Sequence, residues 1–380
     1  MAMAYAAAWF CFLSIFLNLV SLAIAAVRAR PRRKPLLPPG VAPGVSIVRP
    51  LCGLDNFCEE TLKSSFELDY PSYEIIFCVA QANDPAVPLA RRLIARHPER
   101  PAQLIIGDEK MSVNPKLNNC VRGWDKARYD WIILADANVL MPKDYIQRLL
   151  ASWRRRTGLV CSMPLGSHPR NFWAELECAF LNTFEARWQF CAEAMGLGFA
   201  QGKSMLWRRE VLDKAGGIRA LSAEIIEDAA ATKLVRQQDL GVNLVTGGPF
   251  EQPLGFRTAT EVWMRQARWA RTRRKTFPLY YAPEIFAGPF LSCLAAAYAA
   301  FHFGVNVPGA ILSVALLWYA PELLFAKALK WHVSSATPIA LVLRDLMFPV
   351  IYIDAWLTDD FAWRGHEMSV REEEPSVERG

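Results

Sequence analysis

The chain has 380 residues, of which 53% are hydrophobic; this is more than a soluble enzyme usually needs, so we expect part of the protein to lie in lipid. The formal net charge of +6 is modest and its positive part is clustered, which indicates local contact with anions and argues against wholesale nucleic-acid binding. The nine cysteines form no C-x-x-C pair, so neither a zinc site nor a disulfide framework is predicted, and a reducing compartment fits best.

The N-terminal segment is strongly apolar. Residues 5–27 contain no charge and are long enough to cross a hydrocarbon core of roughly 30 Å as a helix. A basic run from Arg28 to Lys34 follows directly, whereas a signal peptide carries its positive charge before the apolar run. We therefore predict an uncleaved anchor over residues 1–27 with its C-terminal side in the cytosol. The basic and Pro-rich residues 28–44 are predicted to form a stiff linker.

From residue 45 the pattern changes to that of an α/β domain. Residues 44–51, 73–80, 102–107 and 129–138 are short β-rich runs, and segments of helical period separate them. Near-continuous apolar strands that alternate with helices predict a parallel sheet covered on both faces. Such sheets bind ligands at the carboxyl ends of their strands, so we look for chemistry there. We assign residues 45–284 to this cytosolic domain.

Three carboxylates lie where such a site is expected. Asp84 follows one strand, Asp136 ends another in "WIILADANV", and Asp228 precedes a helix-like run. Each has an ordinary structural explanation, because aspartate is a common turn residue and helix cap. Asp136 is the hardest to explain that way, since an apolar strand that delivers an acid to the ligand-binding edge is suited to a metal-diphosphate site.

The segment Glu261–Lys275, "EVWMRQARWARTRRK", is compatible with a helix and places two tryptophans among six cations. Nucleic acid, a membrane surface or a phosphorylated substrate could each explain this composition. A solvated amphipathic helix on a membrane surface is the simplest structural explanation.

The ordered set Asp84, Asp136, Asp228 and "RQARW" (Arg265 to Trp269) resembles the D, D, D, (Q/R)-x-x-R-W signature of processive-type inverting glycosyltransferases. Those enzymes have the nucleotide-diphospho-sugar transferase (GT-A) fold. The segments "RPLCGLD", "NPKLNN" and "IEDAAATKL" are similar to corresponding parts of the ceramide glucosyltransferase family. The likeness runs from about residue 45 to 280 and rests on several independent motifs. It implies a GT-A, Rossmann-like α/β domain flanked by N- and C-terminal transmembrane helices.

The resemblance implies a UDP-sugar donor and a divalent cation, Mn²⁺ or Mg²⁺, that bridges the donor phosphates. Asp136 is the expected metal ligand, and Asp84 is expected in the nucleotide pocket. An inverting transfer needs a base that takes the proton of the acceptor hydroxyl, and the family match assigns this role to Asp228. Glu227 is its rival, because adjacent residues differ only in side-chain direction.

Five further groups receive expected roles. Arg265 and Arg268 share one helical face and are expected to meet the diphosphate, and Trp269 would offer an apolar wall near the acceptor or sugar. Lys116 is expected to approach the donor, and Arg49, at the end of the first strand, to contact the nucleotide. The cations that follow Trp269 are expected to touch anionic lipid head groups.

The C-terminal third is apolar again. Residues 285–304 and 308–326 predict a membrane hairpin, while residues 336–357 contain Arg344 and Asp345. That last run could be a third span, a re-entrant segment or an interfacial helix. We therefore expect a membrane region of two or three segments over 285–360, and a tail over 361–380 that is disordered from Arg364 onward.

We expect an integral membrane protein of a bacterial inner membrane, with a cytosolic catalytic domain and no nucleic-acid partner. It would transfer a hexose from a UDP-sugar to ceramide, and glucose is the expected hexose. Alternatives are diacylglycerol or a hopanoid as acceptor, and UDP-galactose, UDP-glucuronate or UDP-N-acetylglucosamine as donor. A polysaccharide synthase is disfavoured, because few C-terminal spans leave little material for a channel. A membrane-bound nucleotide-sugar-binding protein without catalysis is the alternative from another class.

Overall fold

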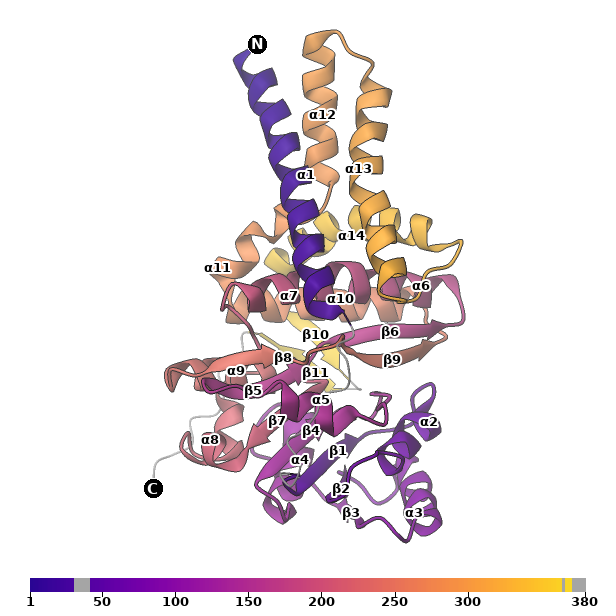
Figure 1. The fold of residues 1–380 in the computed structure, drawn as a ribbon, viewed down its shortest axis with the longest axis vertical. Helices are drawn as coiled ribbons and strands as arrows, with labels where there is room; N and C mark the ends of the chain where they lie inside the picture. Colours follow the sequence, from indigo (N-terminus) through magenta and orange to yellow (C-terminus); the bar gives the residue numbers. More distant parts are fainter. Residues whose placement is uncertain (31–41, 364–365, 371–380) are drawn as a thin grey trace.

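A computed structural model describes residues 1–30, 42–363 and 366–370, so most of the predicted linker lies outside the described residues. A seven-stranded sheet forms the centre of the lower domain, in the order β3-β2-β1-β4-β7-β5-β8 (Figure 1). Its strands are β1 (Val45–Leu51), β2 (Tyr73–Val79), β3 (Ala102–Ile106), β4 (Trp131–Ala135), β5 (Thr157–Ser162), β7 (Ser204–Arg208) and β8 (Gly241–Leu244).

The strands β1 to β4 are parallel, as the sequence predicts, but β7 runs antiparallel to both β4 and β5. The sheet is therefore mixed and not wholly parallel. Every residue of β1 and β2 is buried, because helices cover both faces. The helices α4 (Pro115–Lys126) and α9 (Glu227–Gln237) pack on one face. The other face is covered by α2 (Cys58–Lys63), α3 (Ala86–Arg96) and α5 (Tyr145–Ala151).

A layer of helices lies above this domain, across the long axis of the molecule (Figure 1). It contains α6 (Phe172–Cys178), α7 (Ala186–Ala194) and α10 (Ala259–Thr276), and a π-helical segment, Ala179–Glu185, joins α6 to α7. The parallel pair β6 (Pro164–Pro169) and β9 (Phe250–Gly255) leads into it. Two short helices, α8 (Arg209–Asp213) and α11 (Pro278–Tyr281), complete the connections.

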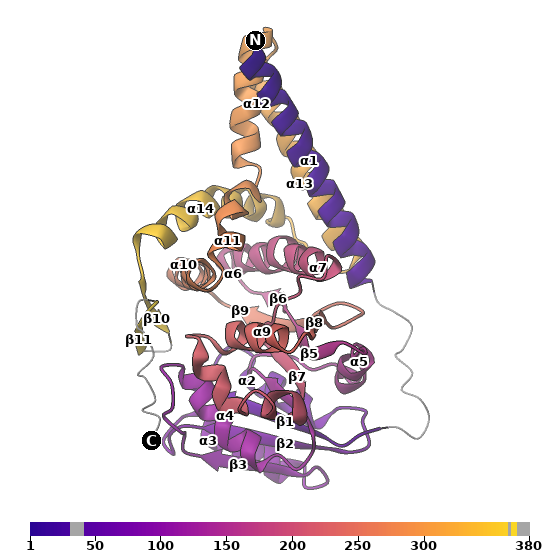
Figure 2. The ribbon, with the colours of Figure 1, turned by 90° about the vertical axis from the view of Figure 1, so that its left-hand side faces the viewer.

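Three apolar helices stand side by side at the far end: α1 (Ala2–Ala29), α12 (Phe290–Phe303) and α13 (Val307–Ala328) (Figure 2). By length and composition α1 and α13 could each cross a membrane, and α12 could form a third span together with the bent segment from Pro278 to Phe286. The predicted N-terminal anchor and C-terminal hairpin therefore both correspond to helices suited to a bilayer.

The third apolar run forms α14 (Thr337–Leu357), which in the described part of the chain is not among the candidate spans. It lies across the foot of the apolar helices (Figure 1). Its outward side chains are apolar and recur at helical spacing: Ile339, Val342, Leu346, Val350, Ile353 and Leu357 are all exposed. Its opposite face is buried against α6 and α10. This geometry favours the interfacial alternative over a third span.

Four buried charges join the apolar helices to the layer below. Arg187 of α7 pairs with Glu322 of α13 at 2.9 Å, and Arg344 of α14 pairs with Glu322 at 3.0 Å and with Asp345 at 2.7 Å. Arg187 also donates a hydrogen bond to Asn18 of α1. The charged pair in α14 thus faces protein, as its cost in lipid requires.

The tail does not follow the prediction throughout. Two strands, β10 (Asp360–Trp363) and β11 (His366–Ser369), form an antiparallel hairpin after α14. The expectation of disorder from Arg364 onward is wrong for β11, because Phe361, Met368 and Val370 form an apolar cluster against Val113 and Ile225. Residues 371–380 lie outside the described part.

Candidate active site

One large cavity, of about 1040 Å³, lies between the carboxyl end of the sheet and α10. Its lining brings together groups that are far apart in the sequence. Seven of the eight predicted site residues take part: Asp84, Lys116, Asp136, Asp228, Arg265, Arg268 and Trp269. The rule that ligands bind at the carboxyl ends of strands therefore leads to this cavity.

Asp136 follows β4 at the cavity floor. Its Oδ1 lies 2.6 Å from the Nζ of Lys116, and its Oδ2 lies 2.9 Å from the Nζ of Lys203. Burial alone would raise the pKa of Asp136, but the two ammonium groups hold it well below its ordinary value. The carboxylate is therefore charged at any physiological pH.

Asp136 and Asn138 offer two oxygens that could hold a divalent cation only if donor phosphates and water supplied most of its ligands. Lys203 Nζ lies 2.9 Å from Asp136 Oδ2 and 3.3 Å from Asn138 Oδ1, so a positive charge already occupies the point where these oxygens converge. Within residues 1–30, 42–363 and 366–370, no three His, Cys, Asp or Glu side chains are grouped to hold a metal. One carboxylate with substrate phosphates is a usual Mg²⁺ arrangement, and Lys203 would have to move aside to admit the ion.

Glu227 and Asp228 occupy the first turn of α9 and both line the cavity, but their polar contacts differ. Glu227 is buried, accepting a hydrogen bond from Asn114 at 2.7 Å through Oε2 and pairing with Lys116 at 2.6 Å through Oε1. Both of its oxygens are thus engaged by the protein. Asp228 lines the cavity, and its Oδ2 accepts a hydrogen bond from the backbone N–H of Gly202 at 3.2 Å.

The pKa of Asp228 is raised to about 7, first by burial and second by the neighbouring charge of Glu227. Lys116 and the Gly202 N–H act in the opposite direction but are weaker. A carboxylate with a pKa near neutrality, at the wall of a cavity, can accept a proton and release it again at physiological pH.

Lys116 links the carboxylates of Asp136 and Glu227. Its Nζ contacts Asp136, Glu227 and the carbonyl oxygen of Gly202, each at 2.6 Å. Burial would lower the pKa of Lys116, but the two carboxylates hold it above its ordinary value, so this ammonium stays charged. Gly202 fits closely here: a Cβ at this position would lie 2.7 Å from Glu227 Oε1 and 2.9 Å from Lys116 Nζ. No local sequence pattern predicts this link between α4 and α9.

Asp84 fulfils its ordinary structural role and also lines the cavity. It accepts hydrogen bonds from the backbone N–H of Ala86 at 2.8 Å, at the start of α3, and from that of Gly53 at 3.0 and 3.1 Å. The second contact fixes the loop that follows β1. Asp84 therefore shapes the end of the cavity next to β1 and β2.

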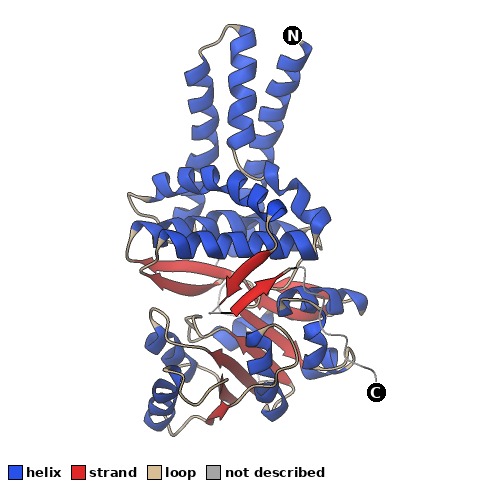
Figure 3. Ribbon diagram, turned by 180° about the vertical axis from the view of Figure 1, so that it is seen from behind, coloured by secondary structure: helices blue, strands red, loops and turns tan. Residues whose placement is uncertain are grey.

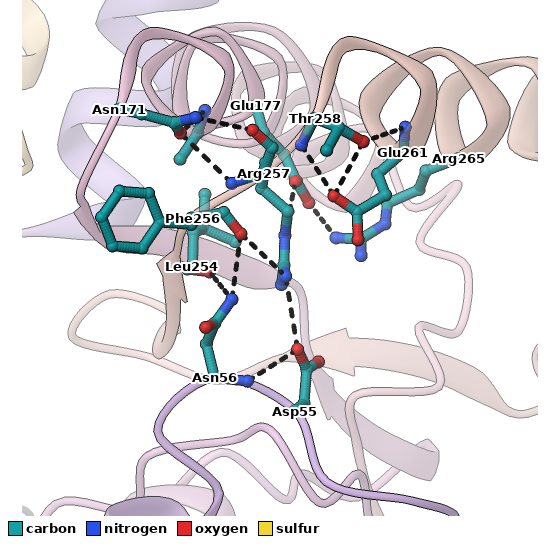
Figure 4. A network of polar contacts seen from close by, with 11 residues as sticks. Asp55, Asn56, Asn171, Glu177, Leu254, Phe256, Arg257, Thr258, Glu261 and Arg265 are labelled. Atoms are coloured by element: carbon teal, nitrogen blue, oxygen red, sulfur yellow. Dashed lines mark hydrogen bonds and ion pairs between the residues drawn. The ribbon is translucent and has the colours of Figure 1, made fainter.

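The helix α10 covers the cavity from the opposite side, and the prediction of a helix over Glu261–Lys275 is confirmed. A capping box formed by Thr258 and Glu261 begins it. Figure 4 shows the ion-pair network beneath this turn. The fully buried Glu177 accepts from Arg265 and, at 3.2 Å, from Arg257, and Arg257 also contacts Asp55 at 3.3 Å.

This network was not expected from the sequence, yet it joins three separate segments at the rim of the cavity. Asp55, Arg257 and Arg265 all line the cavity, so the guanidinium groups face both Glu177 and the open space. Two arginines and two carboxylates, Glu177 and Asp55, make this network formally neutral, so its ion pairs hold the rim of the cavity in a fixed arrangement.

Trp269 has one side against the apolar cluster of Ala174, Cys178, Leu181 and Leu254. Its ring lines the cavity together with Arg268, one residue before it. Three of the four later cations of α10 differ from expectation, whereas Lys275 is exposed. Arg271, Arg273 and Arg274 pair with Asp354, Glu284 and Asp359 respectively, so they bind protein carboxylates in place of lipid head groups.

Arg49 is the one predicted site residue that the structure does not bring to the cavity. It is fully buried, and its guanidinium donates to the carbonyl oxygens of Asp136, Ala137 and Val139 at 2.9 to 3.0 Å. A further bond reaches the carbonyl of Thr61. Arg49 therefore holds the loop that carries Asp136, from beneath.

Comparison with known proteins agrees with this geometry. A "Ceramide glucosyltransferase 3" of Caenorhabditis elegans is 25% identical over 331 residues, which covers 85% of this chain and 72% of the relative. A "Ceramide glucosyltransferase" of Komagataella phaffii is 29% identical over 300 residues, covering 64% and 59% respectively. Among solved structures, a mannosyltransferase from Pyrobaculum calidifontis in complex with GDP-Man and Mn²⁺ superposes with a TM-score of 0.49 and 19% identity over 94% of this chain and 97% of that one.

The model of a single family, described as "Glycosyl transferase family 21", matches residues 12–375. The match spans the α/β domain, the apolar helices and the β10–β11 hairpin. The predicted GT-A nucleotide-sugar transferase fold and the resemblance to ceramide glucosyltransferases are thereby confirmed. This chain belongs to glycosyl transferase family 21.

Proposed function

We propose that the protein transfers glucose from UDP-glucose to the primary hydroxyl of ceramide, with inversion at the anomeric carbon. The observation that carries this proposal is that three aspartates and the Arg265–Trp269 segment line one cavity. The relatives named ceramide glucosyltransferase, at 25% and 29% identity, support the choice of sugar and acceptor.

The donor end of the cavity lies at β1 and β2. There the loop from Leu51 to Gly53 is held by a hydrogen bond from the Gly53 N–H to Asp84. The backbone groups of this loop and the Asp84 carboxylate would contact the nucleotide. Arg265 and Arg268 face this region from α10, and they would stabilise the charge that grows on UDP as it leaves. A divalent cation bound at Asp136 and Asn138 would neutralise the diphosphate in the ground state and in the transition state.

The base is Asp228. Its Oδ2 is fixed by the N–H of Gly202, while Glu227 is committed to Lys116 and Asn114. Asp228 would take the proton from the acceptor hydroxyl as that oxygen attacks the anomeric carbon, on the side opposite to the departing UDP. Lys116 keeps Asp136 and Glu227 in fixed positions relative to this base.

A lipid acceptor suits the position of the cavity. Its α10 wall belongs to the helical layer directly below the apolar helices, so the site lies on the side of the domain that faces them (Figure 2). We propose that α1, α12 and α13 place this layer at a membrane surface, with residues 42–284 on the cytosolic side. A ceramide hydroxyl at that surface would reach the cavity without leaving the bilayer.

The test is turnover by the full-length protein, purified in detergent, with ceramide and isotope-labelled UDP-glucose. We expect a hexosylceramide by mass spectrometry, and a β-linked product by the anomeric proton coupling in NMR, which would establish inversion. A panel of UDP-galactose, UDP-glucuronate and UDP-N-acetylglucosamine, with diacylglycerol and a hopanoid, ranks the alternatives.

The Asp228→Asn protein serves as the matched control for background hydrolysis. If the protein binds UDP but transfers sugar to none of these lipids, the enzyme hypothesis is refuted. A nucleotide-sugar-binding protein without catalysis would then be favoured.

A further inference from the structure

The β10–β11 hairpin extends from the helical layer back to the cavity described above. After α14 the chain turns down past α10, and β10 and β11 lie between the helical layer and the α/β domain (Figures 2 and 3). Segments near the end of the chain thus reach loops from its first and middle thirds. Nothing in the signature motifs refers to this part of the sequence.

The hairpin is fastened to α10 by two arginines. Arg271 donates to the carbonyl oxygen of Asp360 at 2.9 Å and pairs with Asp354 at 2.6 Å, and Arg274 pairs with Asp359. Arg271 is itself buried. These contacts fix the start of β10 on the helix that also carries Arg268 and Trp269.

Phe361 is the hairpin residue that enters the site. It is only 6% exposed, and it lines the cavity together with Asp228, Ile226 and Trp269. Behind it, Met368 and Val370 complete an apolar cluster with Val113 and Ile225.

The two segments that pack against this cluster both lead to Glu227 and Asp228. Ile225 lies three residues before Asp228, and Val113 is next to Asn114, whose amide donates to Glu227. Phe361 therefore lines the same cavity as Asp228, and its cluster packs against the segment that leads to Asp228.

We propose that Phe361 is a positioning residue for the lipid acceptor: its ring forms an apolar wall beside Asp228 that holds the acceptor hydroxyl near the base. This inference rests on the proposed function. An inverting base must sit between the acceptor and the anomeric carbon, so the groups around Asp228 contact the acceptor. The phosphates gain nothing from an apolar wall, whereas the hydrocarbon next to a ceramide hydroxyl does. Stacking of the uracil base on the ring is the alternative that the Kd for UDP tests.

The same wall would keep water away from the base. If the ring is removed, a water molecule can take the place of the acceptor hydroxyl. The anomeric C–O bond to UDP then breaks, the water oxygen forms the new bond, and Asp228 receives the proton, giving free sugar and UDP. A loss of acceptor binding should therefore be accompanied by more hydrolysis of the donor.

The test compares Phe361→Ala and Phe361→Leu with the wild-type protein, all at full length in detergent. For Phe361→Ala we expect the KM for ceramide to rise roughly tenfold or more, because an apolar contact of that size is lost. The fraction of UDP-glucose hydrolysed should increase, and the Kd for UDP should stay within about twofold. Phe361→Leu keeps an apolar side chain and should recover most of the acceptor affinity.

Two further measurements separate the possible failures. Met368→Ala alters the hairpin cluster outside the cavity, so an identical rise in KM and hydrolysis there would show a merely structural role and overturn the inference. Binding of a short-chain fluorescent ceramide without donor reports the acceptor site directly. Equal ceramide binding and equal KM in wild type and Phe361→Ala would also overturn it, while leaving the proposed function intact. Wild-type protein that transfers sugar to no lipid would refute the proposed function itself.

Discussion

Replacing Asp228 with asparagine tests the proposed base most directly. Asparagine has nearly the same shape, and its side-chain oxygen can still accept the hydrogen bond that Gly202 N–H donates at 3.2 Å. It cannot take a proton, so we expect kcat to fall by a factor on the order of 10² to 10⁴, the usual contribution of a general base. The Kd for UDP-glucose should change little, because the base does not hold the donor.

The pH dependence of kcat/KM is an independent test of Asp228 as the base. Because the pKa of Asp228 is raised to about 7, mainly by burial and by Glu227, its reactive ionised form predominates only above neutrality. The wild-type kcat/KM should therefore rise with pH and level off above about 8, and at pH 6 it should be about a tenth of the plateau. For stability the sign is opposite: the folded state binds this proton more tightly, so its stabilisation is present at low pH and is lost as pH rises through about 7.

The assay is the initial rate of hexosylceramide formation from pH 5.5 to 9, with UDP-glucose affinity measured by calorimetry. Glu227→Gln is the matched control: removing the neighbouring charge should move the midpoint to lower pH, because one cause of the raised pKa is gone. A flat profile in the wild type, or an Asp228→Asn protein that binds no donor, would refute the assignment of the base.

Three other changes test the rest of the site. Asp136→Asn should weaken manganese-dependent UDP-glucose binding roughly tenfold or more, because the charge that holds the cation is lost; calorimetry with and without manganese checks this, and unchanged metal dependence would contradict it. Gly202→Ala places a Cβ 2.7 Å from Glu227 Oε1 and should lower kcat by a factor on the order of 10². Its control, Gly241→Ala, meets its nearest atom only at 3.6 Å and should keep wild-type rates. Cysteines introduced at positions 110 and 155 should react with an impermeant thiol reagent only after cells are lysed, and ready labelling of intact cells would reverse the topology.

The sequence predicts β1 to β4 to within a few residues. The strands β1, β2 and β4 are buried almost throughout and have nearly continuous apolar runs, whereas the edge strand β3 is only partly buried. The antiparallel direction of β7 could not be read the same way. Strand direction depends on where the chain enters the sheet, and no local pattern records that.

The residues of the candidate site also fall into those that local sequence patterns identify and those that they do not. Asp84, Asp136 and Asp228 stand at strand or helix ends that local patterns identify, and all three line the cavity. Arg49 also stands at the end of a strand, but its side chain runs under the loop to backbone carbonyls, and a sequence cannot distinguish these two directions. Phe361 carried no signal, because the cavity residues near which it lies come from segments that are distant in the sequence.

The paired charges between α7, α13 and α14 have a practical consequence for how the protein can be handled. Glu322 belongs to an apolar helix, yet it neutralises Arg187 of the layer below and also Arg344. Cutting away the apolar helices would leave Arg187 buried without its counter-charge, and breaking such a buried pair typically destabilises a fold by about 3–5 kcal/mol. The apolar helices and the helical layer are thus one folding unit. A water-soluble fragment without the apolar helices would need Arg187 replaced by an uncharged residue in order to fold stably.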